Sequence, residues 1–266
     1  MVITGASRGI GRALALAVAT RPDTRLWLVA RDGDALAAVA ADVAEAGGRA
    51  EVVVGDLGTV ATARALGQSL VERVGPATTL VHNAGLWPTR LQHNADGLEV
   101  AFAINGLAGL AMQAPLLAAA RVARVMVVSA GLIVKGNFDP DRTPTGDDFS
   151  VLRTYCTTKL VQAIAMRRVA AEHPELDMVV LHPGVVRTDL GALGGPLGWL
   201  AKLVKRMWED PAVTGRRLAD ILAQPRWSEP GEARWMFEDE TQPWPEVATD
   251  PATTEAVMSA VERRLA

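Results

Sequence analysis

The 266-residue sequence contains one cysteine, Cys156, and one tyrosine, Tyr155. A single cysteine excludes an internal disulfide and a cysteine-based metal cluster, and the sequence predicts no metal site. The net charge of −3 leaves no basic excess to neutralise nucleic-acid phosphates. No apolar run reaches the ~18 residues that span a membrane, and the chain opens without a signal-peptide pattern. We therefore expect a cytoplasmic protein that binds neither nucleic acid nor membrane.

Lysine is also scarce, with four residues in a chain whose other basic residues are all arginine. Such Ala- and Arg-rich usage is typical of a GC-rich bacterial genome. The hydrophobic fraction of 49% and the charged fraction of 21% are ordinary for a soluble protein with a large core. At this length we expect one α/β domain over residues 1–266.

Tyr155 and Lys159 lie four residues apart at the head of an apolar-periodic run over residues 160–171. On a helix this spacing places both side chains on one face. An ammonium favours the phenolate and lowers a phenol pKa that otherwise lies near ~10, so the tyrosine can exchange a proton near neutral pH. The alternative is an ordinary surface pair, and only a cofactor motif upstream favours catalysis over it.

Such a motif stands at the start of the chain. A very short apolar strand runs into glycines at positions 5, 9 and 11, and then into a helix over residues 12–20. Glycines with this spacing allow a tight turn, close approach to a pyrophosphate and close helix packing. The helix N-terminus offers free N–H groups to that phosphate. A plain glycine-rich loop is the alternative.

The end of the second strand indicates which dinucleotide binds. An acid there binds the 2′-hydroxyl of NAD, whereas a nearby arginine accommodates the 2′-phosphate of NADP. Here Ala30 is followed by Arg31, whose guanidinium fork suits phosphate. Arg8 in the glycine loop can reach the same phosphate. We favour NADP(H) over NAD(H), although Asp32 and Asp34 follow closely and leave NAD open.

Apolar segments that are typical of strands alternate with helical segments along the chain. After the short first strand, strands are expected at residues 26–30, 50–54, 80–82, 124–128, 178–181 and 234–237. This alternation predicts a doubly wound, mostly parallel sheet of seven strands with helices on both faces. Ligands bind at the carboxyl ends of such strands.

Three polar residues have two interpretations each. Asp56 follows the third strand, where it can meet an adenine amino group or cap the next helix. His82 lies in an apolar strand, which is more typical of a core residue than of a ligand. Asn105 lies in a helix-length run over residues 97–120, where its amide can orient a water or face solvent.

Six motifs occur in a fixed order: Thr4-Gly-Ala-Ser-Arg-Gly-Ile-Gly11, Asp56-Leu57, Asn83-Ala-Gly85, Asn105, Tyr155-x-x-x-Lys159, and Pro183-Gly184 followed by Thr188. As a set over residues 1–190, they resemble the short-chain dehydrogenase/reductase family. The long segment before Tyr155, with Gly136-Asn-Phe-Asp139, is similar to its retinol-dehydrogenase-like branch. The resemblance implies a Rossmann-type fold, a nicotinamide dinucleotide and hydride transfer.

The resemblance also implies a role for each motif. Tyr155 would protonate the carbonyl oxygen as hydride arrives, or deprotonate the alcohol in reverse. Lys159 would hold the nicotinamide ribose and lower the Tyr155 pKa, and Asn105 would hold a proton-relay water. Val185 and Thr188 would contact the nicotinamide carboxamide. The whole dinucleotide would be bound by Gly5, Ser7, Arg8, Gly9, Ile10, Gly11, Arg31, Asp56, Leu57, Asn83, Ala84, Gly85, Tyr155, Lys159, Pro183, Gly184, Val185 and Thr188.

One position departs from the family pattern. The family places two serines after the fifth strand and uses the second to bind the substrate oxygen, but here the pair is Ser129-Ala130. Because side chains alternate along a strand, Ser129 points away unless the strand end is distorted. Losing one donor to a developing oxyanion costs ~3 kcal/mol, or about a hundredfold in rate. Either Ser129 substitutes through a local shift, or another donor acts (Thr143, Thr145 or His182), or the fold serves a different reaction.

Residues 190–225 correspond to the family's substrate lid, which we expect over an apolar pocket. Leu200, Leu203 and Val204 begin an apolar stripe at helical spacing. Core packing or a membrane-surface helix would give the same stripe. Four of the seven tryptophans follow residue 200, which indicates a large apolar pocket or a subunit interface. The resemblance implies a homodimer or homotetramer.

Together these features favour an NADP(H)-dependent oxidoreductase that interconverts a carbonyl and an alcohol on a fairly apolar small molecule. Tyr155, Lys159, Asn105 and Ser129 would be its catalytic residues. A non-redox step such as cyclisation, epimerisation or elimination is the alternative, motivated by Ala130. A non-catalytic nucleotide sensor is a third reading, but a sensor has no need of a tuned phenol.

Overall fold

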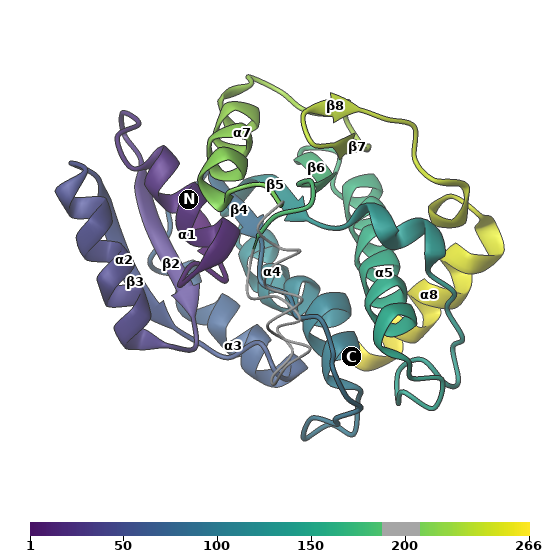
Figure 1. Cartoon of the computed structure of the whole chain (residues 1–266). Helices are drawn as coiled ribbons and strands as arrows, with labels where there is room; N and C mark the ends of the chain where they lie inside the picture. The colour runs from purple at the N-terminus through teal and green to yellow at the C-terminus, as the bar shows by residue number, and fades with distance from the viewer. Residues whose placement is uncertain (188–207) are drawn as a thin grey trace.

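A computed structural model describes residues 1–187 and 208–266 of the chain. Its centre is one eight-stranded sheet in the order β3-β2-β1-β4-β5-β6-β7-β8 (Figure 1). All neighbouring strands are parallel except β7 and β8. This confirms the predicted doubly wound fold and adds an eighth strand. The strands are β1 (Val2–Thr4), β2 (Arg25–Ala30), β3 (Arg49–Val54), β4 (Thr78–His82), β5 (Val122–Val128), β6 (Asp177–His182), β7 (Ala233–Phe237) and β8 (Glu240–Thr241).

Helices cover both faces of the sheet. One face packs against α1 (Gly9–Val18), α2 (Gly33–Glu45) and α7 (Pro211–Ala223). The other packs against α3 (Val60–Val71), α4 (Ala108–Ala118), α5 (Val151–Glu172) and α8 (Pro251–Leu265). Figure 1 shows α7 beside α1, and α8 alongside α5. Short helical turns at Phe102–Leu107, Gly131–Lys135 and Glu246–Ala248 connect these layers.

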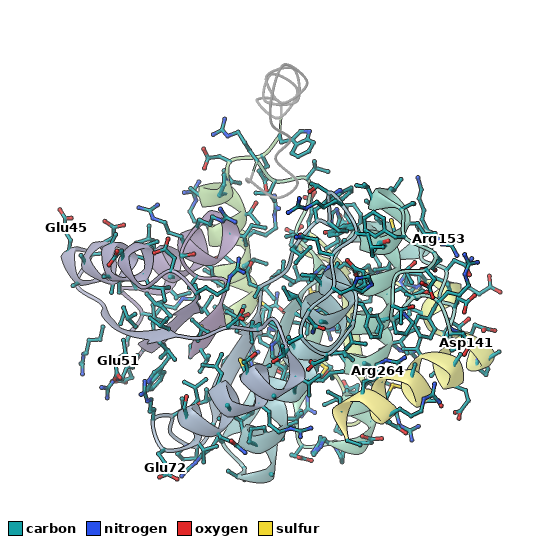
Figure 2. All side chains as sticks on the ribbon, turned by 90° about the horizontal axis from the view of Figure 1, so that it is seen from below. Glu45, Glu51, Glu72, Asp141, Arg153 and Arg264 are labelled. Carbon is teal, nitrogen blue, oxygen red and sulfur yellow. The ribbon has the colours of Figure 1, made fainter. Side chains whose placement is uncertain are left out.

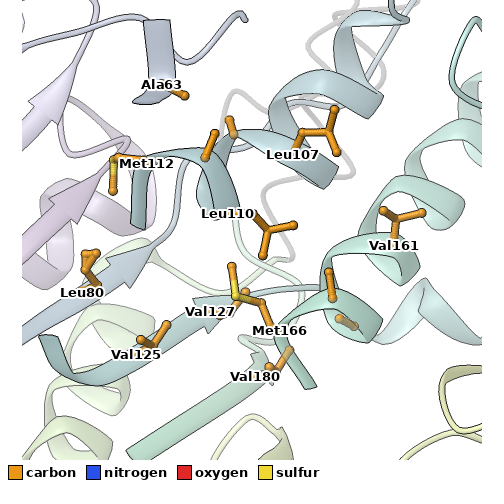
Figure 3. Close-up of a cluster of buried hydrophobic side chains, with 14 of the residues drawn as sticks. Ala63, Leu80, Leu107, Leu110, Met112, Val125, Val127, Val161, Met166 and Val180 are labelled. Atoms are coloured by element: carbon orange, nitrogen blue, oxygen red, sulfur yellow. The ribbon is translucent and has the colours of Figure 1, made fainter. Parts of the chain in front are cut away.

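Side chains of the central strands are buried on both faces. In β5, Val125 and Val127 pack under α4 and α5, whereas Met126 and Val128 pack toward α1 and α7. Figure 3 shows the first of these cores, with Val127 and Val180 of the sheet beside Met166 of α5. Charged side chains such as Glu45 and Glu72 project outward at the rim (Figure 2). Near-continuous apolar strands of this kind are typical of parallel sheets.

Two sequence predictions change in detail. The expected helix over residues 97–120 is a π-helix at Phe102–Leu107 followed by the α-helix α4. Most of the expected lid, residues 190–207, lies outside the described residues, as does its apolar stripe at Leu200, Leu203 and Val204. Residues 211–223 of that segment form α7, which packs on α1.

The described residues contain neither a membrane-spanning helix nor a cluster of metal ligands. None of the described helices is long and apolar enough to cross a bilayer. Within residues 1–187 and 208–266, no group of three or more His, Cys, Asp or Glu side chains is arranged to hold a metal ion.

A partly buried ion pair joins β5 and β6 near the amino ends of the strands. Arg124 Nε of β5 donates to Asp177 Oδ2 of β6 at 2.9 Å, and the Arg124 guanidinium stacks on Trp227 at 3.7 Å. Asp177 Oδ1 accepts from the backbone N–H groups of Trp227 and Ser228. Arg124 also donates to the carbonyls of Leu222 and Gln224 after α7. The pair thus joins two strands to the segment that follows α7.

We predict that Asp177→Ala lowers the free energy of unfolding by about 2–4 kcal/mol, because it leaves the buried backbone N–H groups of Trp227 and Ser228 without an acceptor and removes the carboxylate that pairs with Arg124. Urea unfolding followed by circular dichroism measures this. Glu172→Ala, which removes the exposed Arg168–Glu172 pair of α5, is the control and should leave the midpoint unchanged. Equal midpoints for the two variants would contradict the role of Asp177.

Candidate active site

Apart from Tyr155 and Lys159 on α5, the described residues predicted to bind the dinucleotide follow carboxyl ends of parallel strands, so they share one edge of the sheet. Gly5, Ser7, Arg8, Gly9, Ile10 and Gly11 follow β1, and Arg31 follows β2. Asp56 and Leu57 follow β3, whereas Asn83, Ala84 and Gly85 follow β4. Pro183, Gly184 and Val185 follow β6, and Thr188 lies outside the described residues.

The glycine turn has the shape that a pyrophosphate requires. Gly5 and Gly9 have φ values of 66° and 56°, in the left-handed region that favours glycine. A Cβ on Gly11 would lie only 2.4 Å from the Gly5 carbonyl oxygen, so the backbone can turn this tightly only with glycine. The turn leads directly into the N-terminus of α1, whose free N–H groups suit phosphate. These residues therefore fit a dinucleotide.

Thr4, which the sequence analysis did not single out, joins this turn to β4. Its Oγ1 donates to the Val81 carbonyl at 3.2 Å and accepts from the backbone N–H groups of Asn83 and Ala84. The Asn83 amide donates in return to the Thr4 and Gly5 carbonyls. The Asn83 side chain thus fixes the start of the glycine turn against the end of β4. The only sequence signal for Thr4 was its place at the head of the glycine motif.

Arg8 and Arg31 are exposed, and their guanidinium groups form no hydrogen bond or ion pair within the described residues. By contrast, Asp32 is engaged, because its Oδ1 accepts from the Ala35 N–H and caps α2. Asp56 accepts from the Gly58 N–H and does not cap α3, since Thr59 does. Of the two predicted interpretations of Asp56, helix capping is therefore wrong.

Lys159 is buried beneath the carboxyl end of β5. Its Nζ donates to the Val128 carbonyl at 2.9 Å and to Gln162 Oε1 at 3.1 Å. A Cβ on Gly85 would lie 3.3 Å from that Nζ, so the loop after β4 passes directly over the ammonium. Burial disfavours the charged form and lowers the pKa of Lys159 to about 8.

Tyr155 lies one turn earlier on α5 and is 7% exposed. Its ring stacks on Trp87 with centroids 4.2 Å apart. Its hydroxyl forms no hydrogen bond within the described part of the chain. Burial, with Cys156 second, raises the pKa of Tyr155 to about 12. The expected lowering by Lys159 is wrong for the chain by itself, because burial dominates.

The Asn105 side chain is 1% exposed and lies in the π-helix η1 (Phe102–Leu107). Its Oδ1 accepts from the Leu86 N–H at 2.9 Å, and its Nδ2 donates to the Leu86 carbonyl at 2.9 Å. Nδ2 also donates to Thr158 Oγ1 on α5. Asn105 therefore does not face solvent, and its predicted hold on a proton-relay water stays a prediction.

The strand end at Ser129 is not distorted. The Ser129 N–H bonds the Leu181 carbonyl at 2.7 Å, in register with β6, and Ala130 is extended. The Ser129 hydroxyl is buried and has no partner among the described residues. Because this hydroxyl is not open to a bound molecule, its position argues against the predicted catalytic role of Ser129.

The three alternative donors differ in availability. The hydroxyl of Thr143 donates to Asp148, and that of Thr145 lies against Asp147 and the Arg142 carbonyl. His182, at the end of β6, packs its ring on Phe237 and has a buried Nδ1 with no partner in the described chain. Burial lowers the pKa of His182 to about 4, so the imidazole is neutral.

His82, as expected, is a core residue, and its Nε2 lies 2.9 Å from Gln113 Oε1.

The turn after β6 is held by Arg217, another residue that the sequence did not indicate. Arg217 Nη1 donates to the Pro183 carbonyl at 3.1 Å, and its other nitrogen pairs with Glu209 at 2.6 Å. Gly184 has a φ of 91°, which explains the glycine. Val185 follows with its side chain 57% exposed at the predicted nicotinamide position.

Comparison with known proteins shows the family of this chain. The sequence model of the short chain dehydrogenase family matches residues 1–193. A protein of Streptomyces sp. (strain C5) assigned as a daunorubicin C-13 ketoreductase is 33% identical over 194 residues, covering 72% of this chain and 67% of its own. Retinol dehydrogenase 14 of Mus musculus is 29% identical over 208 residues, covering 72% of this chain, and the chain spans only 62% of that protein's length.

The fold has solved counterparts. An alcohol dehydrogenase from the archaeon Thermococcus sibiricus, crystallised with 5-hydroxy-NADP, superposes with a TM-score of 0.64 at 24% identity. The superposition covers 91% of this chain and 97% of that one. At this identity the likeness shows the fold alone.

We predict that Tyr155 ionises with a pKa of about 12 in the chain without nucleotide. Tyr155 is the only tyrosine, so the ultraviolet absorbance of tyrosinate reports on it alone. The band should be missing at pH ~10, where an ordinary phenol is half ionised, while circular dichroism shows a folded protein. Tyr155→Phe gives the blank spectrum. A midpoint near the ordinary value in the folded protein would contradict the burial argument.

Proposed function

Because this chain belongs to the short-chain dehydrogenase/reductase family, we propose that it is an NADP(H)-dependent oxidoreductase that interconverts a carbonyl and an alcohol on a fairly apolar small molecule. The observation that carries the proposal is the pair on α5. Tyr155 is a buried side chain whose hydroxyl forms no hydrogen bond within the described residues, and Lys159 lies one turn further along the helix. Tyr155 and Lys159 lie near the carboxyl edge of the sheet, where the glycine turn also lies.

In this proposal Tyr155 is the general acid of carbonyl reduction. When bound, the nicotinamide supplies the hydride. The raised pKa keeps the Tyr155 oxygen protonated at neutral pH, which is the form that a proton donor needs. The Lys159 ammonium, with a pKa of about 8, is still mostly charged there and stabilises the phenolate left after proton donation. Gly5, Gly9, Gly11 and the N-terminus of α1 would hold the pyrophosphate.

The preference for NADP(H) is supported by the two unpaired arginines. Arg8 and Arg31 face solvent near the glycine turn, and Asp32, the acid that could compete, is engaged as a helix cap. A bidentate guanidinium suits a 2′-phosphate. The archaeal relative named above was crystallised with an NADP derivative.

The apolar nature of the substrate is supported by exposed side chains near Tyr155. Val134, Leu152, Val185 and Phe237 are each at least 45% exposed. Val134 and Val185 follow β5 and β6, Phe237 ends β7, and Leu152 lies in the first turn of α5, so all four lie toward this edge. Leu152 precedes Tyr155 by three residues on α5 and so shares its face. Such residues favour an apolar molecule over a highly charged one. The two curated relatives carry the names of a ketoreductase and a retinol dehydrogenase.

A non-redox reaction is the second candidate, and Ala130 is the observation that favours it. The position that a substrate-binding serine would occupy carries no hydroxyl, and the neighbouring Ser129 hydroxyl is buried. Cyclisation, epimerisation or elimination can use Tyr155 as acid/base with no net cofactor turnover. Under either candidate function, three expectations stay predictions: the homo-oligomer, the cytoplasmic location and the substrate lid.

We predict that Tyr155→Phe lowers the rate of NADPH oxidation with a carbonyl panel by about a hundredfold or more, because it removes the proton donor. Ala130→Ser should raise the rate, by up to about a hundredfold if its hydroxyl reaches the developing oxyanion. Absorbance of NADPH measures both. Product formation that needs Tyr155 but consumes no NADPH would favour the non-redox candidate instead.

We predict that Arg31→Asp weakens NADPH binding by about tenfold to a hundredfold and leaves NADH binding unchanged or tighter, because a charged hydrogen bond to the 2′-phosphate is lost. Nicotinamide fluorescence titration gives both affinities. Arg49→Asp makes the same charge change at the amino end of β3 and should alter neither. Equal weakening by the two variants would contradict a 2′-phosphate contact at Arg31.

A further inference from the structure

Trp87 lies face to face with the tyrosine at the centre of the site. Its ring centroid is 4.2 Å from that of Tyr155, and the two planes differ by 28°. We propose that Trp87 is a positioning residue, which fixes the phenol ring of Tyr155 so that its hydroxyl meets the substrate oxygen in one geometry. The proposal rests on the proposed function, because it assigns Trp87 a role in the proton transfer by Tyr155.

The Tyr155 side chain needs a packing contact to fix its position, because no hydrogen bond holds its hydroxyl. Within residues 1–187 and 208–266, the Tyr155 hydroxyl has no hydrogen-bond partner. The hydroxyl lies on the long axis of the ring, so its position is set by rotation about the Cα–Cβ bond, which has three staggered wells. An offset stack against a second aromatic ring adds a preferred orientation at close range. Trp87 is the aromatic side chain that the structure places there.

The backbone next to Trp87 is held by a series of hydrogen bonds that leads back to Tyr155; we call this series, closed by the Trp87–Tyr155 ring contact, the circuit. Asn105 makes two hydrogen bonds to the backbone of Leu86, the residue before Trp87. Asn105 Nδ2 also donates to Thr158 Oγ1, which in turn donates to the Tyr155 carbonyl. The circuit therefore runs from the Tyr155 backbone through Thr158, Asn105 and Leu86 to the Trp87 ring, and back to the Tyr155 ring.

Burial makes this circuit stiff. Asn105 and Thr158 are 1% and 0% exposed, so water does not compete for their hydrogen bonds. Asn105 lies in the π-helix, a helix form that is rare and frequent at functional sites. The hydrogen bonds join the loop after β4 to α5, so the backbone at Leu86, next to Trp87, cannot move away from α5 without breaking one of them. Trp87 thus transmits the position of that loop to the phenol.

The first experiment observes the ring directly. Because Tyr155 is the only tyrosine, biosynthetic 3-fluorotyrosine places a single fluorine reporter in the protein. We expect one shifted fluorine resonance in the wild type, caused by the ring current of Trp87. Trp87→Leu should move this resonance toward the unfolded position and broaden it, and Trp87→Phe should retain most of the shift. Trp244→Leu, which removes a half-buried tryptophan whose ring is tilted against that of Trp235, should leave it unchanged.

The second experiment separates positioning from substrate contact. A misplacement of about 1 Å in a reacting group can cost about a hundredfold in rate. We therefore expect Trp87→Leu to lower kcat by about tenfold to a hundredfold, with a smaller change in KM. Trp87→Phe should stay within about threefold of wild type, and Trp244→Leu should match it. Thermal unfolding and NADPH affinity of each variant show whether the fold and the cofactor site are retained.

Each outcome has one meaning. An unchanged fluorine signal in Trp87→Leu would overturn the stack, and a changed signal with unchanged kcat would overturn the positioning role. A rise in KM alone would make Trp87 a substrate contact and also overturn it. If the wild type reduces no carbonyl, the proposed function fails, and the fluorine signals still decide whether Trp87 holds the ring.

Discussion

The hydrogen bonds of the Thr4 hydroxyl join the ends of β1 and β4, where the two loops of the site begin. The strand order reverses between β1 and β4, and their ladder ends after Ile3 and Val81. The connections after β1 and β4 leave on opposite faces of the sheet, and ligands of doubly wound folds bind at such a reversal. Thr4 Oγ1 and the Asn83 amide continue the pairing of the two strands by side-chain hydrogen bonds where the backbone ladder stops. The glycine turn and the Gly85 loop are thereby held in a fixed relation, with Lys159 beneath the second of them.

Burial sets the chemistry of the two residues on α5 in opposite directions. The same loss of hydration raises the pKa of the Tyr155 phenol and lowers that of the Lys159 ammonium. The Val128 carbonyl and Gln162 offset part of the cost for the lysine, whereas the phenol has only a stacked ring beside it. The chain alone therefore favours a neutral phenol, and a phenolate requires further positive charge or hydrogen bonding at the tip.

Sequence reasoning succeeded where the cause is local. Glycine spacing in the first turn, strand–helix alternation and the four-residue separation of Tyr155 and Lys159 depend on neighbouring residues, and the structure reproduces each. It failed where the cause is tertiary. The pKa of Tyr155 depends on burial under a loop distant in the chain, and the π-helix at Asn105 does not alter apolar periodicity enough to be detected. Trp87 carried no signal, because a single aromatic residue in a loop has no period.

The eighth strand has a consequence for how this sheet meets other chains. An open edge strand offers unpaired N–H and C=O groups to a neighbouring chain. Here β8 covers β7 with only two residues, and Pro243 and Pro245 follow, neither of which has an N–H to donate. At the opposite edge β3 carries Arg49 and Glu51, and Glu51 pairs with Arg25 of β2. Both ends of the sheet thus disfavour strand addition, so self-association by this protein would use its helices and loops.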